Sequence, residues 1–102
     1  MNPIELQYLH KIQEITDNFT SKNKDDKRIS SVLYASFLID KLFVESPLED
    51  IYCEERTIFE ASIGLKLYRV LRDVEFKIIE TFGEDSLVEE LLKEVFAIVD
   101  FD

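Results

Sequence analysis

The sequence predicts an all-α fold: a bundle of four principal helices, mainly antiparallel, with a long central third helix. Only two glycines and two prolines occur in 102 residues, whereas β-sheet proteins need many turns built from such residues. In addition, four periodic apolar segments each begin with a capping residue followed three positions later by glutamate. These starts are Asn2-Pro3-Ile4-Glu5, Ser46-Pro47-Leu48-Glu49, Thr57-Ile58-Phe59-Glu60 and Ser86-Leu87-Val88-Glu89. The length fits one domain, residues 1–102.

The first two helices are expected over residues 3–19 and 27–44. In the first segment, apolar residues recur at spacings of three and four and share one stripe: Ile4, Tyr8, Ile12, Ile15 and Phe19. Residues 20–27 contain no apolar side chain, so we expect a solvated loop that ends in Asp25 or Asp26 as the next cap. The second segment is apolar on more than one stripe. We therefore predict a wide buried face made of Ile29, Val32, Leu33, Phe37, Leu38, Ile39, Leu42 and Phe43.

A proline, Pro47, separates the second helix from the long third one. The residue before a proline, here Ser46, is displaced from the helical region, and residues 47–53 are a candidate for a short extra helix. The third helix is expected from a Thr57 cap to Gly83, since glycine suits a left-handed C-cap. Its apolar residues form a coiled-coil-like seam: Leu67, Leu71, Val74, Ile78 and Phe82. The fourth helix should run from Leu87 to about Val99, with Leu87, Leu91, Val95 and Ile98 inward.

The formal charge of −10 belongs to the second part of the chain. Residues 1–44 contain six acids and six bases, whereas residues 45–102 contain 16 acids and six bases. The acids form two blocks, 45–55 with no base and 80–102 with one. Between the blocks, opposite charges recur at helical spacing and are expected to pair, as in Arg69–Asp73, Asp73–Lys77 and Arg72–Glu75. The blocks indicate either solubility or a surface for a basic partner.

Tyr52 lies inside the first acidic block. An aromatic anchor ringed by charge is typical of the hot spots of protein interfaces, and the alternative is a tyrosine that packs its ring into the bundle. We take the candidate partner-binding residues from the two blocks. They are Glu45, Glu49, Asp50, Tyr52, Glu54, Glu55, Glu84, Asp85, Glu89, Glu90 and Glu94.

The residues that carry chemistry in enzymes are scarce, and we expect no enzymatic activity, no cofactor and no metal site. His10 is the only histidine and Cys53 the only cysteine, which is too few for a Cys/His zinc site or an internal disulfide. No nucleophile accompanies His10, and the carboxylates beside Cys53 disfavour a reactive thiolate. Phosphate-binding glycine loops, hydrolase and metalloprotease signatures and the EF-hand pattern are absent.

We expect a cytoplasmic protein. The first residues lack the basic and apolar regions of a signal peptide, and the longest near-apolar run, residues 32–39, is too short for a membrane span of about 20 residues. The single cysteine fits a reducing interior. A strongly negative chain should avoid bare nucleic acid and anionic membranes.

The short segment from Ser46 to Tyr52 resembles the immunity proteins of DNase colicins. Those small acidic helical proteins neutralise basic nucleases and also place tyrosine among acids after their second helix. The second tyrosine of that family is missing here, and the long helix from Ile58 differs from that family's short third helix. The resemblance implies a type of partner, a basic nuclease.

Three hypotheses for function follow. The first is a non-enzymatic protein that neutralises or regulates a basic partner protein, as an immunity protein or antitoxin does when it occludes the nucleic-acid site of a nuclease toxin. The second is a nucleic-acid mimic of the phage or plasmid type that blocks a DNA-binding enzyme. The third is a structural homodimer subunit, joined through the seam residues Leu67, Leu71, Val74 and Ile78.

Overall fold

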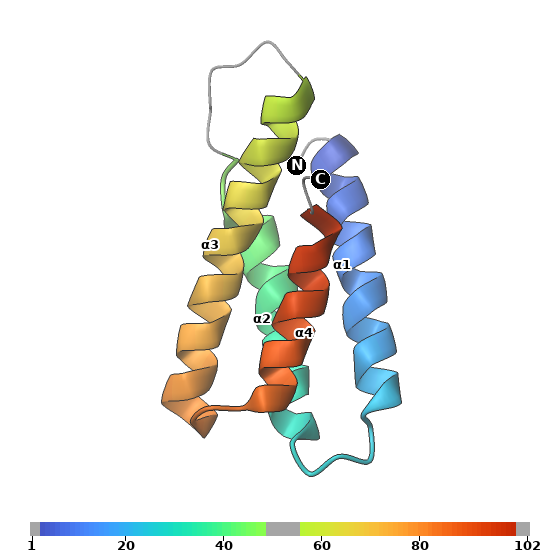
Figure 1. The fold of residues 1–102 in the computed structure, drawn as a ribbon, viewed down its shortest axis with the longest axis vertical. Coiled ribbons are helices and arrows are strands. Elements are labelled where there is room, and N and C mark those ends of the chain that lie inside the picture. Colours follow the sequence, from blue (N-terminus) through green and yellow to red (C-terminus); the bar gives the residue numbers. More distant parts are fainter. Residues whose placement is uncertain (1–2, 49–55, 100–102) are drawn as a thin grey trace.

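The protein is a bundle of four α-helices (Figure 1). The computed structural model describes residues 3–48 and 56–99, and for residues 56–61 it describes the backbone only. The helices are α1 (Pro3–Lys22), α2 (Ile29–Glu45), α3 (Arg56–Phe82) and α4 (Ser86–Phe96), and a short 3-10 helix (Ala97–Val99) continues α4. No strand occurs in the described ranges. The predicted all-α bundle with a long third helix is therefore confirmed.

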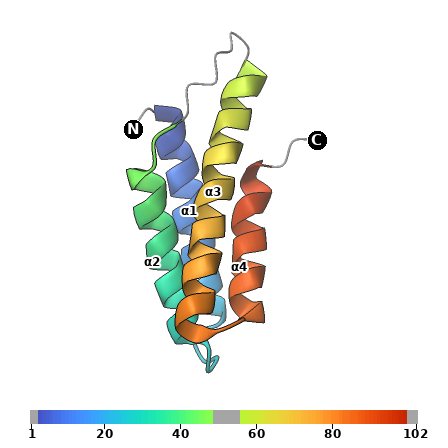
Figure 2. The same cartoon turned by 90° about the vertical axis from the view of Figure 1, so that its left-hand side faces the viewer.

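Successive helices run in opposite directions, and α4 closes the bundle against α1 (Figures 1 and 2). The molecule is elongated, with principal extents of 47 × 25 × 25 Å. α2 and α4 each pack against both α1 and α3, and they also contact each other. The end at which α1 begins is also the end at which α2 finishes, α3 begins and α4 finishes (Figure 1). None of the helices in the described ranges has the length and apolar character that crossing a membrane requires.

A core of aliphatic side chains runs the length of the bundle. Each helix contributes residues at spacings of three and four, so that one stripe of every helix meets the others. The side chains with almost no exposed surface include Ile12, Val32, Ile39, Phe43, Ile63, Leu67, Val74, Ile78, Leu91 and Val95. This core fixes the directions in which the remaining faces of the helices point.

α1 is three residues longer than predicted, and its buried stripe is turned by about one position. The buried residues are Glu5, Leu9, Ile12, Thr16 and Phe19, whereas Ile4 is exposed. Two of the five predicted positions, Ile12 and Phe19, are shared by both stripes. The hydroxyl of Thr16 donates to the carbonyl of Gln13 at 3.0 Å, which makes its burial acceptable.

The wide buried face predicted for α2 is wrong in part. Leu33 and Phe37 are 52% and 60% exposed, and Val44 is exposed as well. The helix instead buries small residues, Ser31 and Ala35, beside Val32, Leu38, Ile39 and Phe43. The neighbours α1, α3 and α4 cover only one side of α2, so the opposite side remains in solvent however apolar it is.

The seam predicted on α3 is confirmed as core, because Leu67, Leu71, Val74 and Ile78 are all buried. These side chains are therefore occupied within one bundle and do not form a seam between subunits. Phe82 lies at the margin instead, where its ring makes an edge contact with Tyr34 of α2 at 5.9 Å between centroids.

The helix ends agree with the sequence signals at some positions and depart from them at others. Ser46 leaves the helical region with ψ 133, as expected before proline. Gly83 has φ +82 and its N–H donates to the carbonyl of Ile79 at 3.0 Å, which confirms the predicted C-cap. Thr57 lies within α3 and is not its cap. The predicted cap Asn2 and most of the candidate helix 47–53 fall outside the described residues.

Candidate functional site

The acidic candidates lie at both ends of the bundle. Glu45 ends α2, whereas Glu84 and Asp85 precede α4 at the opposite end (Figure 1). Glu84, Glu89, Glu90 and Glu94 are exposed and form no hydrogen bond or ion pair within the part of the chain that the structure describes. Glu49, Asp50, Tyr52, Glu54 and Glu55 lie outside the described residues.

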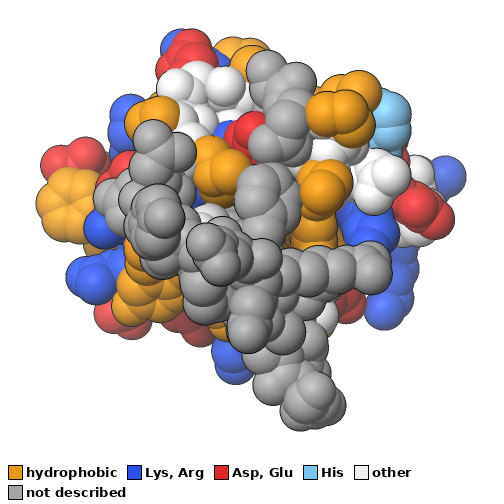
Figure 3. Space-filling view, turned by 90° about the horizontal axis from the view of Figure 1, so that it is seen from above, with side chains coloured by type: hydrophobic (Ala, Val, Ile, Leu, Met, Phe, Trp, Pro, Cys, Tyr) orange, Lys and Arg blue, Asp and Glu red, His pale blue; other side chains and the backbone are white. Residues whose placement is uncertain are grey.

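Charges of both signs surround the end at which α1 begins (Figure 3). Blue and red side chains alternate around its perimeter, with hydrophobic side chains between them. The described part of that end therefore presents no surface of a single sign. Residues 84–99, which include the loop before α4, hold five acids and one base.

Asp85 is a structural residue rather than a free carboxylate. It is the N-cap of α4, and its Oδ1 accepts hydrogen bonds from the N–H groups of Leu87 at 3.0 Å and Val88 at 3.2 Å. This arrangement corrects the sequence prediction that Ser86 caps the helix. The second oxygen, Oδ2, accepts a hydrogen bond from the hydroxyl of Ser31. Asp85 therefore links the start of α4 to the first turn of α2.

Arg28 completes this link between the α1–α2 loop and α4. Its guanidinium donates to the hydroxyl of Ser86 at 2.9 Å and forms an ion pair with Asp26 at 3.1 Å. Side-chain hydrogen bonds from Arg28 lower the pKa of Asp26, and the same bonds raise the pKa of Arg28. Asp26 also accepts from the N–H of Arg28 at 2.8 Å. The prediction that Asp25 or Asp26 caps the second helix is wrong, because the N-cap is Arg28, which makes no side-chain cap hydrogen bond, and α2 begins at Ile29.

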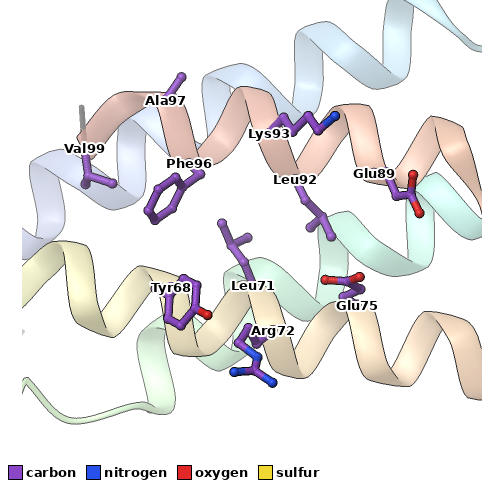
Figure 4. A pocket seen from close by; sticks show the side chains of 10 residues that line it. All are labelled: Tyr68, Leu71, Arg72, Glu75, Glu89, Leu92, Lys93, Phe96, Ala97 and Val99. Atoms are coloured by element: carbon purple, nitrogen blue, oxygen red, sulfur yellow. The ribbon is translucent and has the colours of Figure 1, made fainter. Parts of the chain in front are cut away.

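A groove of about 800 Å³ lies between α3 and α4 (Figure 4). Its floor is apolar, formed by Leu71 and Leu92, with Val99 at one end. The rings of Tyr68 and Phe96 stand at that same end with 6.2 Å between their centroids. Both rings are more than two-fifths exposed, so the groove opens to solvent on large aromatic surfaces.

Four charged side chains line the rest of the groove. Arg72 lies beside Tyr68, Lys93 lies on α4 between Phe96 and Glu89, and Glu75 lies across the groove from Glu89 (Figure 4). Although Arg72 and Glu75 were predicted to pair, no ion pair joins them, nor does one join Asp73 and Lys77, among the described residues. Arg72 instead lies 5.8 Å from the centroid of the Tyr68 ring.

The interior holds an ion pair that the sequence analysis missed. The ammonium of Lys66 on α3 donates to Oε2 of Glu5 on α1 at 2.6 Å, with the two side chains only 2% and 9% exposed. The same ammonium lies 4.3 Å from the centroid of the Phe43 ring. A usable signal was present: Lys66 lies three residues after Ile63 and four before Val70, which are core positions.

Two further polar atoms in α2 are buried without a partner in the described structure, the hydroxyl of Ser36 and Oδ1 of Asp40. Burial raises the pKa of Asp40, and the negative charge of Asp17 on α1 raises it further. These groups form a polar strip on the α1 side of α2. In this region two carboxyl groups, those of Asp40 and Asp17, lie near each other.

The described residues contain no group of three or more His, Cys, Asp or Glu side chains that could hold a metal ion. His10 is exposed on α1, and Cys53 lies outside the described residues. Neither the protein-family models, nor the curated proteins, nor the solved structures include a match to this chain.

Proposed function

We propose that this chain is a non-enzymatic acidic binding protein that neutralises or regulates a basic partner protein, and that three acids before and on α4, Glu84, Glu90 and Glu94, take part in the contact. The observation that supports the proposal is that these carboxylates are exposed and have no hydrogen bond or ion pair within the described structure. Glu90 also attracts the guanidinium of Arg28, which is one of the smaller causes of the raised pKa of Arg28, and all three carboxylates remain accessible to a partner.

The spacing of two of these acids strengthens the argument. Glu90 and Glu94 are four residues apart and so share one flank of α4, where like charges repel by about 0.2–0.5 kcal/mol. They are not among the residues that line the α3–α4 groove. A partner that places lysine or arginine against this flank would relieve the repulsion and gain complementary potential, which speeds association and sets specificity.

A nuclease toxin is the class of partner that we propose. Its Lys and Arg side chains normally contact phosphate, and carboxylates from 84–94, with those of 45–55, would occupy the same side chains. Inhibition would then result from occlusion of the nucleic-acid site. Site residues in 45–55 other than Glu45 lie outside the described structure and enter the proposal on sequence grounds alone.

The test is to purify the product of the neighbouring reading frame, which such systems encode together, and to measure its binding by calorimetry between about 50 and 500 mM salt. We expect affinity to fall steeply as salt rises, because exposed charges are screened. The variant Glu90→Lys/Glu94→Lys should weaken binding, whereas Glu14→Lys/Glu80→Lys, with the same net charge change at other exposed sites, should weaken it less. Affinity that is indifferent to salt would refute the electrostatic mechanism.

A further inference from the structure

We propose that the α3–α4 groove is the contact surface of a symmetric homodimer, so that its occupant is a second copy of this chain. The inference goes beyond the binding of a basic partner and uses different residues. It rests on the order of side chains along the groove, which is complementary to itself when reversed.

The surface concerned is a row of residues on α3 at alternating spacings of three and four. Tyr68, Arg72 and Glu75 line the groove, and the same spacing continues the row to Ile79 and Phe82. All five side chains of this row are exposed. A row of this kind forms the contact seam when two helices pack against each other. It is distinct from the seam on α3 that is buried inside the bundle.

Over its first four members, Tyr68, Arg72, Glu75 and Ile79, the row reads apolar, basic, acidic, apolar. The midpoint of these four lies between Arg72 and Glu75. A two-fold axis perpendicular to α3 through this midpoint lays a second α3 antiparallel on the first. Arg72 of one copy then lies opposite Glu75 of the other, and Tyr68 lies opposite Ile79.

α4 repeats the arrangement across the groove. Lys93 and Glu89 line it at a spacing of four residues, and the same axis sets Lys93 of one copy toward Glu89 of the other. Within one copy these four charges form no ion pair in the described structure. Glu75 and Glu89 lie across the groove from each other (Figure 4). Each cation of one copy thus meets an anion of its partner, which supplies the ion pairs that these four charges do not form within one copy.

The available area indicates a weak dimer. From residue 65 to residue 82 the face measures about 25 Å along α3, and two helices give it a width of about 20 Å. Each copy would therefore cover roughly 500 Å², and the pair roughly 1,000 Å², which is near the lower limit for specific interfaces. We expect dissociation in the micromolar range.

The experiment is sedimentation equilibrium of the full chain from about 1 to 500 µM at about 0.15 M salt, since screening reduces the self-repulsion of the net charge. The wild type should shift from 12.0 kDa toward twice that mass. Arg72→Glu and Glu75→Arg should each weaken dimerisation at least about tenfold, because like charges then meet twice across the two-fold axis. The double variant Arg72→Glu/Glu75→Arg should restore it.

Matched controls use exposed charges on the other side of α3, Lys77→Glu and Glu80→Arg, which should leave the dimer unchanged, and circular dichroism checks the fold of each variant. A wild type that stays monomeric at 500 µM would overturn the proposal. So would a dimer that tolerates both single reversals, or one that the double reversal fails to restore. Failure of these tests leaves the binding of a basic partner by Glu90 and Glu94 unaffected, since those residues lie outside the groove.

Discussion

The buried ion pair between Lys66 and Glu5 makes the stability of this bundle sensitive to single substitutions and tolerant of a double one. In Lys66→Met, the carboxylate of Glu5 loses the ammonium that lies 2.6 Å from it. In Glu5→Leu, the ammonium of Lys66 is left with only the face of the Phe43 ring, at 4.3 Å from the centroid. In the double variant, both charges are replaced by apolar side chains of similar volume.

The magnitude follows from burial. With side chains 2% and 9% exposed, neither charge can recover hydration by a small movement. Removal of one partner of such a pair costs about 3–5 kcal/mol, which is a large fraction of the roughly 5–15 kcal/mol that stabilises a typical domain. Replacement of both is expected to be neutral or stabilising by about 1–4 kcal/mol, since the desolvation cost of two ions disappears.

Urea denaturation followed by circular dichroism measures these differences. Each single variant should lose about 3 kcal/mol or more, which for a domain of this size corresponds to a melting temperature lower by at least about 10 °C. The exposed lysine variant Lys77→Met is the control and should stay within about 0.5 kcal/mol of the wild type. The reasoning is refuted if Lys66→Met costs less than about 1 kcal/mol, or if the double variant loses the sum of the two single losses, because a coupled pair cannot be additive.

Three further predictions concern stability. Asp85→Ala should lower the free energy of unfolding by about 1–2 kcal/mol, because it removes an N-cap and one of the two acceptors of the Ser31 hydroxyl, the other being the carbonyl of Arg28; Asp85→Asn, which keeps the cap, should cost less in the same urea titration. Asp40→Asn should stabilise the protein at pH 7 and not near pH 3. Burial raises the pKa of Asp40 above the ordinary 3.8, so the folded state binds the proton more tightly than the unfolded state does. The wild type therefore loses stability as pH rises through the raised pKa of Asp40. A constant difference between pH 3 and pH 7 would contradict this. Gly83→Ala should cost about 1 kcal/mol in thermal unfolding from its φ of +82 alone, because an added Cβ would meet no atom within 4 Å; a loss above about 3 kcal/mol would indicate a contact that the structure does not show.

Local signals identified the helices well but their buried faces less well. Gly83 and Ser46 behave as expected because the conformations of glycine and of a residue before proline depend on their own backbone. The choice between the predicted and the observed buried stripe on α1 does not depend on local backbone conformation, since both stripes include Ile12 and Phe19. Glu5 and Thr16 became core because Lys66 neutralises the one and the carbonyl of Gln13 accepts from the other. No local pattern on α1 contains that information.

The same reason limits what could be inferred about a site. In the sequence, Asp85 is one acid of the block 80–102. Only its contact with Ser31, 54 positions away in the chain, makes it a structural link between α4 and α2. Arg72 and Glu75 have suitable helical spacing and yet form no ion pair, because both line the groove that α4 completes. Tyr68 and Phe96, the exposed rings of that groove, come from different helices and have no shared signal in the sequence.

By itself, then, the sequence determined the helical class, the number and approximate ends of the helices, the α3 residues that enter the core, and the part of the chain that holds the negative charge. These depend on interactions between residues a few positions apart, which a helix repeats every turn. The tertiary structure alone decided which apolar residues stay in solvent, which charges are buried as a pair and which remain unpaired along the α3–α4 groove. Those outcomes depend on which helices become neighbours, and that is set by packing between segments distant in sequence.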